Sequence, residues 1–141
     1  MADIHPQLKK DCVLLGRFPL SYLLLMNDSQ YPWFILVPDR ENICEIYQLA
    51  PDDRVQLYAE SDQLSRFIME YYAGEKLNLG AIGNLVPQLH LHHVVRFQSD
   101  PAWPKPVWGA MPAKPYSDEI IGLTKTAFTN ASLAEYAATS I

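Results

Sequence analysis

"PQLHLHHVVR", residues 87–96, holds three of the four histidines of this chain. Apolar and polar residues alternate through it and its end is β-branched, which predicts a strand over residues 88–97. Three interpretations of the histidines stay open at this point: a metal site, a catalytic site, or imidazoles buried for structural reasons.

The spacing of the histidines divides them between two faces of that strand. Side chains two positions apart point to the same face. Gln88, His90 and His92 are therefore expected on one face. His93 is expected on the other, where we interpret it as structural or as part of an interface. Two imidazoles on one face are costly to bury without partners, which favours function for that face.

A metal site finds little support around this strand. Zinc sites use three or four protein ligands, and outside the cluster only His5 remains, with no cysteine or carboxylate close by in sequence. We therefore predict no bound metal. Cys12 and Cys44 lack a CxxC spacing and are expected to be reduced thiols.

Composition limits the class of protein. The chain has 141 residues, of which 49% are hydrophobic and 19% charged, so we expect one globular domain over residues 1–141. A net charge of -5 argues against nucleic acid as a partner. No leader sequence or apolar run long enough for a membrane span is evident, so a cytoplasmic location without membrane contact is expected.

The rest of the chain predicts an α+β fold. Pro51, Asp52 and Asp53 suit the start of a long helix, which is expected over about residues 51–72. Six apolar positions of that helix have helical spacing and are expected to pack on a sheet: 57, 58, 64, 67, 68 and 71. The other expected elements are strands at 18–27, 33–38 and 76–84, a proline- and tryptophan-rich loop at 98–116, and a C-terminal helix at about 117–138. This order favours an antiparallel sheet of about five strands.

A glycine turn precedes the histidine strand. "GAIGN", residues 80–84, can bring backbone N–H groups close to an anion. A neutral imidazole attacks phosphorus readily, and a neighbouring one can donate to phosphoryl oxygens. Together the turn and the strand favour phosphoryl chemistry.

At these residues the chain resembles the histidine-triad (HIT) nucleotide hydrolases and transferases. Their signature is three histidines separated by single apolar residues, often with an arginine four positions after the last one. In this register Gln88 takes the first place, His90 the second, His92 the third, and Arg96 the trailing place. The resemblance covers about residues 13–108, which would be the core of a HIT-like fold.

The resemblance implies a hydrolase that cleaves a nucleotide anhydride, ester or phosphoramidate bond through a covalent nucleotidyl intermediate on His90. His92, Gln88 and backbone N–H groups near Asn84 would stabilise charge on the phosphoryl oxygens. It also implies substrate-binding roles for Asn27, which would hold the ribose, and for Asn78, Gly83 and Asn84 in the phosphate-binding segment. A homodimer is implied, with no cofactor, and any divalent cation would enter with a polyphosphate substrate.

Two departures from the pattern define the alternative. Gln88 stands for a histidine and cannot transfer protons. Trp33 stands where the family commonly has a further histidine. The competing hypothesis is a non-catalytic nucleotide-binding or sensing module. Trp103 and Trp108 are weak candidates for covering the pocket or stacking on a base.

Overall fold

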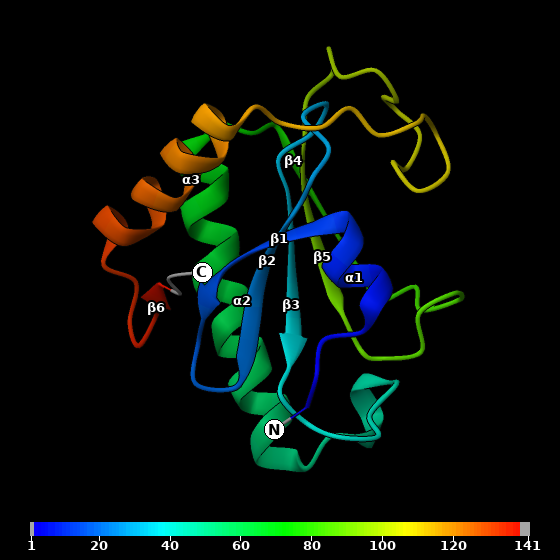
Figure 1. Ribbon diagram of the computed structural model, residues 1–141, viewed down its shortest axis with the longest axis vertical. Coiled ribbons are helices and arrows are strands. Elements are labelled where there is room, and N and C mark those ends of the chain that lie inside the picture. Colours follow the sequence, from blue (N-terminus) through cyan, green and yellow to red (C-terminus); the bar gives the residue numbers. More distant parts are fainter. Residues whose placement is uncertain (1, 139–141) are drawn as a thin grey trace.

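The computed structural model describes residues 2–138 and has a six-stranded antiparallel sheet (Figure 1). The strand order is β4-β5-β3-β2-β1-β6. The strands are β1 (Cys12–Arg17), β2 (Ser21–Met26), β3 (Trp33–Pro38), β4 (Lys76–Gly80), β5 (Leu91–Arg96) and β6 (Ala137–Ala138). The helices are α1 (Pro6–Asp11), α2 (Pro51–Tyr71) and α3 (Asp118–Ala131), with a short 3-10 turn at Ile46–Gln48. The expected α+β fold with an antiparallel sheet is confirmed.

The middle of the sheet is a hairpin formed by the two apolar runs expected as strands at 18–27 and 33–38. β2 pairs antiparallel with β3, with Leu24 opposite Ile35. All six residues of β3 are buried, as expected for a strand covered on both faces. β5 pairs with the other side of β3, so the histidine strand lies beside the best-buried strand of the fold.

Two apolar layers cover the two faces of the sheet. In Figure 1, α2 and α3 lie on one face, whereas α1 and the long loop before α3 lie on the other. Val95 of β5 belongs to the first layer, together with Ile68 of α2 and Phe128 of α3. Val94 belongs to the second, together with Leu8 of α1 and Val107 of the loop. Consecutive residues of β5 therefore face different environments.

The long helix α2 ends one residue before its expected end, and fewer of its apolar residues are buried than expected. Leu57, Leu64 and Ile68 are buried. Tyr58 is 81% exposed and Tyr71 is 51% exposed, so the prediction that they pack on the sheet was wrong. No helix among residues 2–138 is long and apolar enough to cross a membrane.

The ends of the chain differ most from expectation. α1 and β1 were not foreseen, and the strand expected from residue 18 starts at Ser21. The C-terminal helix stops at Ala131 because Ser132 has a left-handed backbone (φ 51°), which no helix continues. Residues 137–138 then form β6 and pair with Gly16 and Arg17 of β1, so the predicted end at 138 was wrong.

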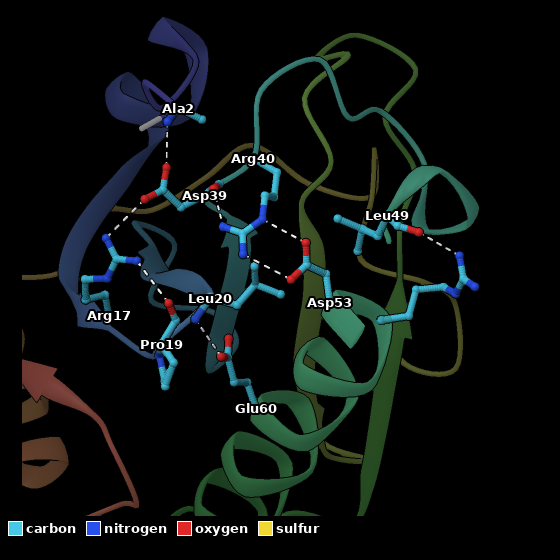
Figure 2. A network of polar contacts seen from close by, with 10 residues as sticks. Ala2, Arg17, Pro19, Leu20, Asp39, Arg40, Leu49, Asp53 and Glu60 are labelled. Atoms are coloured by element: carbon cyan, nitrogen blue, oxygen red, sulfur yellow. Dashed lines mark hydrogen bonds and ion pairs between the residues drawn. The ribbon is translucent and has the colours of Figure 1, made fainter. Parts of the chain in front are cut away.

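Polar contacts tie the chain before α1 to the end of β3 (Figure 2). Asp39 accepts hydrogen bonds from the backbone N–H of Ala2 at 2.6 Å and from Arg17 at 3.3 Å. Arg40 forms two bonds with Asp53 at the start of α2, at 2.8 and 3.0 Å. The Asp39 contact with Ala2 fixes the N-terminal segment against the end of β3 and helps to position α1 over the second face of the sheet, whereas the Arg40–Asp53 pair joins the same end of β3 to α2.

Candidate active site

The histidine face of β5 opens into a cavity of about 770 Å³. Besides the histidines themselves, its walls come from five places in the sequence: the N-terminal segment and α1, Met26 at the end of β2, the start of β3, the turn at residues 82–86, and the loop before α3. His90 and His92 line the same cavity, together with Leu8, Trp33, Asn84 and Trp108. The structure thus brings both predicted catalytic histidines to one site.

His90 lies just before β5 and is oriented by the backbone. Its Nδ1 is 2.7 Å from the carbonyl oxygen of Gln88. A carbonyl can only accept, so Nδ1 carries a proton, and in the neutral ring the lone pair is on Nε2. The side chain is 6% exposed, and its ring centroid is 4.9 Å from that of His92. This bond directs Nε2 of His90 towards the cavity as the nitrogen that can act as a nucleophile.

His92 has the opposite tautomer. The indole N–H of Trp33 donates to its Nδ1 at 2.9 Å, so the ring proton resides on Nε2. Trp108 packs edge-on against the same ring, with centroids 5.3 Å apart. Burial, reinforced by the neighbouring His90 and His93, lowers the pKa of His92 to about 3. At neutral pH His92 is an uncharged hydrogen-bond donor.

His93 faces away from this cavity, as strand alternation predicted. Its Nδ1 donates to the carbonyl of Leu91 at 3.0 Å, and its Nε2 lies 2.7 Å from the hydroxyl of Ser61 on α2. The ring is fully buried, and burial lowers its pKa to about 4. These contacts give His93 a structural role between the sheet and α2.

The Gln88 side chain does not join the two histidines. β5 starts at Leu91 rather than at 88, so strand alternation does not extend to Gln88. Its Oε1 accepts from the backbone N–H of His5 at 2.8 Å, and its Nε2 donates to the carbonyl of Asp3 at 2.9 Å. The amide is thus committed to the N-terminal segment, and only its backbone carbonyl acts on His90.

The predicted substrate-binding residues are divided between different places. Gly83 and Asn84 line the cavity, in a turn where Gly83 has a positive φ of 64° that favours glycine. Asn27 lines an adjoining cavity of about 380 Å³, and its Oδ1 accepts from the backbone N–H of Tyr116. Asn78 is not brought to the cavity, because its Oδ1 accepts from Arg96 at 2.8 Å.

Arg96 ends the histidine strand in a buried ion pair. Asp100 binds its guanidinium through both oxygens, at 2.8 and 3.0 Å, and both side chains are almost completely buried. Burial raises the pKa of Asp100, but the hydrogen bonds from Arg96 and the backbone N–H of Phe97 outweigh it and lower the pKa below 3.8. Trp103 stacks on the same guanidinium at 5.6 Å, so it packs here and does not line the histidine cavity, whereas Trp108 does.

The sequence did not reveal the N-terminal wall of the cavity. His5 and Asp11 line it together with Leu8. His5 caps α1, its Nδ1 accepting from the backbone N–H of Gln7 at 3.1 Å. Pro6 directly after His5 is a helix-start signal that could have predicted α1. Among residues 2–138, no group of three or more histidine, cysteine or acidic side chains is arranged to hold a metal ion.

Comparison with known proteins agrees with this geometry. The HIT domain family model matches residues 7–99. A histidine triad protein from Marinobacter aquaeolei VT8 is 46% identical, with 95% of this chain and 99% of that chain covered and a TM-score of 0.91. Histidine triad proteins from Bradyrhizobium japonicum and Sinorhizobium meliloti 1021 are 39% and 36% identical, covering 91% of this chain and 96% and 95% of theirs, each with a TM-score of 0.89. A comparison with curated protein sequences gave no match.

Proposed function

Because this chain belongs to the HIT domain family, whose members are generally nucleotide hydrolases or transferases, we propose that it hydrolyses a nucleotide through a covalent nucleotidyl intermediate on His90. The bond cleaved is a phosphoric anhydride, ester or phosphoramidate. The observation that carries this proposal is the pair of opposite tautomers in one cavity. His90 offers a lone pair at Nε2, while His92 offers an N–H at its Nε2.

In the first step, the Nε2 lone pair of His90 attacks the α-phosphorus and the leaving group departs in line. The Nδ1–H of His90 keeps its hydrogen bond to the Gln88 carbonyl, which stabilises the positive charge that the ring acquires. His92 donates to a non-bridging phosphoryl oxygen. In the second step, water attacks phosphorus, and the P–N bond breaks to return the electron pair to His90.

The cavity supplies groups for the remainder of the substrate. Gly83 and Asn84 bring backbone and amide donors to its wall, where phosphoryl oxygens would lie. Trp108 offers an aromatic face. Asn27 in the adjoining cavity keeps the ribose as its proposed ligand through its amide nitrogen, since its oxygen already accepts from Tyr116. Asn78 has no such role in our proposal because it binds Arg96.

Gln88 occupies the first place of the triad in the proposed register, and we assign it a supporting role. Its carbonyl orients His90, and its amide holds the N-terminal wall. No cofactor is part of the proposed reaction, and a divalent cation would arrive bound to a polyphosphate substrate. We further propose a cytoplasmic location, in keeping with the unpaired Cys12 and Cys44.

We also propose a homodimer that pairs through α2 and β4. β4 is an edge strand of the described sheet, and Leu79 on it is 52% exposed. On α2, Tyr58 and Val55 are 81% and 71% exposed. Such apolar exposure is typical of a contact surface. Light scattering after gel filtration should give a dimer for the wild type and a monomer for Leu79→Lys/Tyr58→Asp; a monomeric wild type would overturn this part.

The direct test of the enzyme is capture of the intermediate. The protein is mixed with adenosine phosphoramidate or a dinucleoside polyphosphate, quenched within seconds, and analysed by intact mass and peptide mapping. An adduct of one nucleotidyl group on His90 is expected. His90→Asn should give none, whereas His93→Gln, a change of the adjacent histidine on the other face, should keep it.

The competing function is a nucleotide-binding module without catalysis. It predicts nucleotide binding by calorimetry together with no adduct and no turnover for any substrate of these classes. That result would favour the alternative. An adduct located on His92 and not on His90 would instead show that the proposed register is wrong.

A further inference from the structure

We propose that Trp33 is a specificity-determining positioning residue: its indole N–H holds His92 as a fixed N–H donor and so restricts the site to leaving groups that depart without a proton. The inference rests on the proposed function, because it concerns the first step of that reaction. It begins from a hydrogen bond and from what each ring can donate or accept.

The Trp33–His92 bond admits one arrangement of protons. An indole nitrogen can only donate, so Nδ1 of His92 must accept and the proton must lie on Nε2. Both side chains are buried, with 7% and 4% of their surface exposed. Trp33 is further held edge-on between Tyr31 and Trp108, with centroids 6.3 and 6.0 Å away. Neither ring is free to turn and reverse the bond.

This arrangement prevents His92 from acting as a general acid. To deliver a proton efficiently near neutral pH, an imidazole must first be an imidazolium with protons on both nitrogens, because the N–H of a neutral imidazole is a very weak acid. A second proton on Nδ1 of His92 would face the indole N–H of Trp33 at 2.9 Å and break the bond. The low pKa of His92 agrees, since burial and the nearby His90 both oppose a positive charge there.

The other titratable groups that line the cavity, His5 and Asp11, are engaged as acceptors. His5 accepts at Nδ1 from the backbone N–H of Gln7, which caps α1. The Oδ2 atom of Asp11 accepts from the side-chain amide of Gln7 at 2.8 Å. Gln88 does not titrate and is bound to the N-terminal backbone. Around the two histidines the cavity wall thus offers hydrogen bonds without an acid ready to release a proton.

The chemical balance of the first step follows. The Nε2 lone pair of His90 forms the P–N bond, the bond from phosphorus to the leaving atom breaks, and its electron pair leaves with that atom. A phosphate or an acidic phenol departs as a stable anion. An amine or an alkoxide must gain a proton as the bond breaks, and no group on the cavity wall is placed to supply it. In the second step water supplies the new oxygen and its proton passes to solvent.

A leaving-group series tests this restriction. Adenosine 5′-aryl phosphates are prepared from phenols of increasing pKa, and kcat/KM is measured for each, together with adenosine phosphoramidate. A steep fall with phenol pKa is expected, and the phosphoramidate should be slower than the most reactive aryl ester by at least about 100-fold, the usual contribution of a general acid. The inference would be overturned if kcat/KM did not depend on the pKa of the phenol, or if the phosphoramidate were cleaved as efficiently as the most reactive aryl ester.

Variants separate positioning from packing. Trp33→Phe keeps an aromatic ring but removes the N–H, so Nδ1 of His92 becomes free to take up a proton. The ratio of aryl ester to phosphoramidate efficiency should then narrow at least fivefold. Trp108→Phe is the matched control, because Trp108 also contacts His92 but donates no hydrogen bond to it. A ratio unchanged in Trp33→Phe, or narrowed equally in both variants, would contradict the proposal.

A measurement without substrate tests the proton arrangement itself. In ¹⁵N long-range correlation spectra of the wild type, His92 should show a protonated Nε2 and an unprotonated Nδ1 from pH 5 to 8. An imidazolium or an Nδ1–H form in that range would overturn the inference. The outcomes also separate it from the proposed function: rapid phosphoramidate cleavage through a His90 adduct contradicts the inference alone, whereas no adduct with any substrate contradicts both.

Discussion

His92 and His93 are adjacent in the sequence, yet the two faces of β5 give them different chemistry. His92 accepts from an indole and lines a cavity beside a second histidine. His93 is fully buried and is bonded to Ser61 of α2 and to the backbone. Both have lowered pKa values, mainly because both are buried. A shifted pKa therefore does not identify the functional histidine, whereas access to the cavity does.

The largest expected effect is a loss of turnover, with little change in stability, when His90 on the cavity side is replaced. His90→Asn should reduce turnover by at least about 10⁴-fold, as expected when a nucleophile is removed. The unfolding midpoint should change little, because Asn can keep a hydrogen bond to the Gln88 carbonyl. Turnover is followed by release of nucleoside monophosphate and stability by urea titration. Substantial residual turnover in His90→Asn would show that His90 is not the nucleophile.

The second prediction concerns the buried Arg96–Asp100 ion pair at the end of β5, which we expect to stabilise the fold and not to take part in catalysis. Asp100→Ala leaves the guanidinium of Arg96 buried without its partner, which should cost roughly 3–5 kcal/mol of unfolding free energy. The measurement is urea denaturation followed by tryptophan fluorescence. Arg96→Met/Asp100→Leu, which removes both charges, should recover much of the loss. Full stability in Asp100→Ala would show that the pair does not hold the end of β5.

The third prediction uses pH to compare the two buried histidines with the acidic groups. Their pKa values are depressed in the folded state, to about 3 and about 4, from about 6.5 when unfolded. Stability from this source is therefore complete above pH 6.5 and is lost as the pH falls from 6.5 towards 4, by roughly 2–3 kcal/mol for His93. Asp39 and Asp100 have lowered pKa values too, but their contribution is lost only below pH 3.8.

The pH effect is measured as unfolding free energy at intervals between pH 7 and 4. His93→Gln should flatten the dependence, since it removes one proton that only the unfolded chain takes up. A wild-type unfolding free energy that increases as the pH falls from 7 to 4 would contradict the predicted direction of the effect.

The smallest effect is expected on the helix face. Ser61→Ala removes the partner of His93 Nε2 and leaves that nitrogen buried without a hydrogen bond, which should cost about 1–2 kcal/mol. Turnover should stay within about twofold of the wild type. Ser61→Cys retains a weak donor and should cost less. A large loss of turnover in a stable Ser61→Ala would show that the two faces are coupled.

The sequence predicted most reliably where local pattern and structure coincide. β3 and α2 follow apolar runs and a proline start, and alternation correctly opposed His92 to His93. That residues 1–141 form one domain stays a prediction. The cavity wall built from His5 and Asp11 was missed because it depends on packing between distant segments.

The contacts of Gln88 show why the other parts of the site could not be predicted from the sequence. Its partners are 83 and 85 positions away in the sequence, and no local pattern reports such a contact. Alternation also failed for it, because the strand begins three residues later. The hydrogen bond from Trp33 to His92 likewise depends on the pairing of β3 with β5, because the two residues are 59 positions apart in the sequence.

The contacts of Gln88 have a consequence for how this protein can diversify. Its amide binds only backbone atoms of the N-terminal segment, the N–H of His5 and the carbonyl of Asp3. Every residue except proline offers both groups, so a mutation at position 5 leaves the anchor in place while changing what the cavity wall presents. Natural variation and laboratory libraries can therefore alter this wall independently of the chemistry at His90, and selection for new substrates has a segment on which to act without sacrificing the nucleophile.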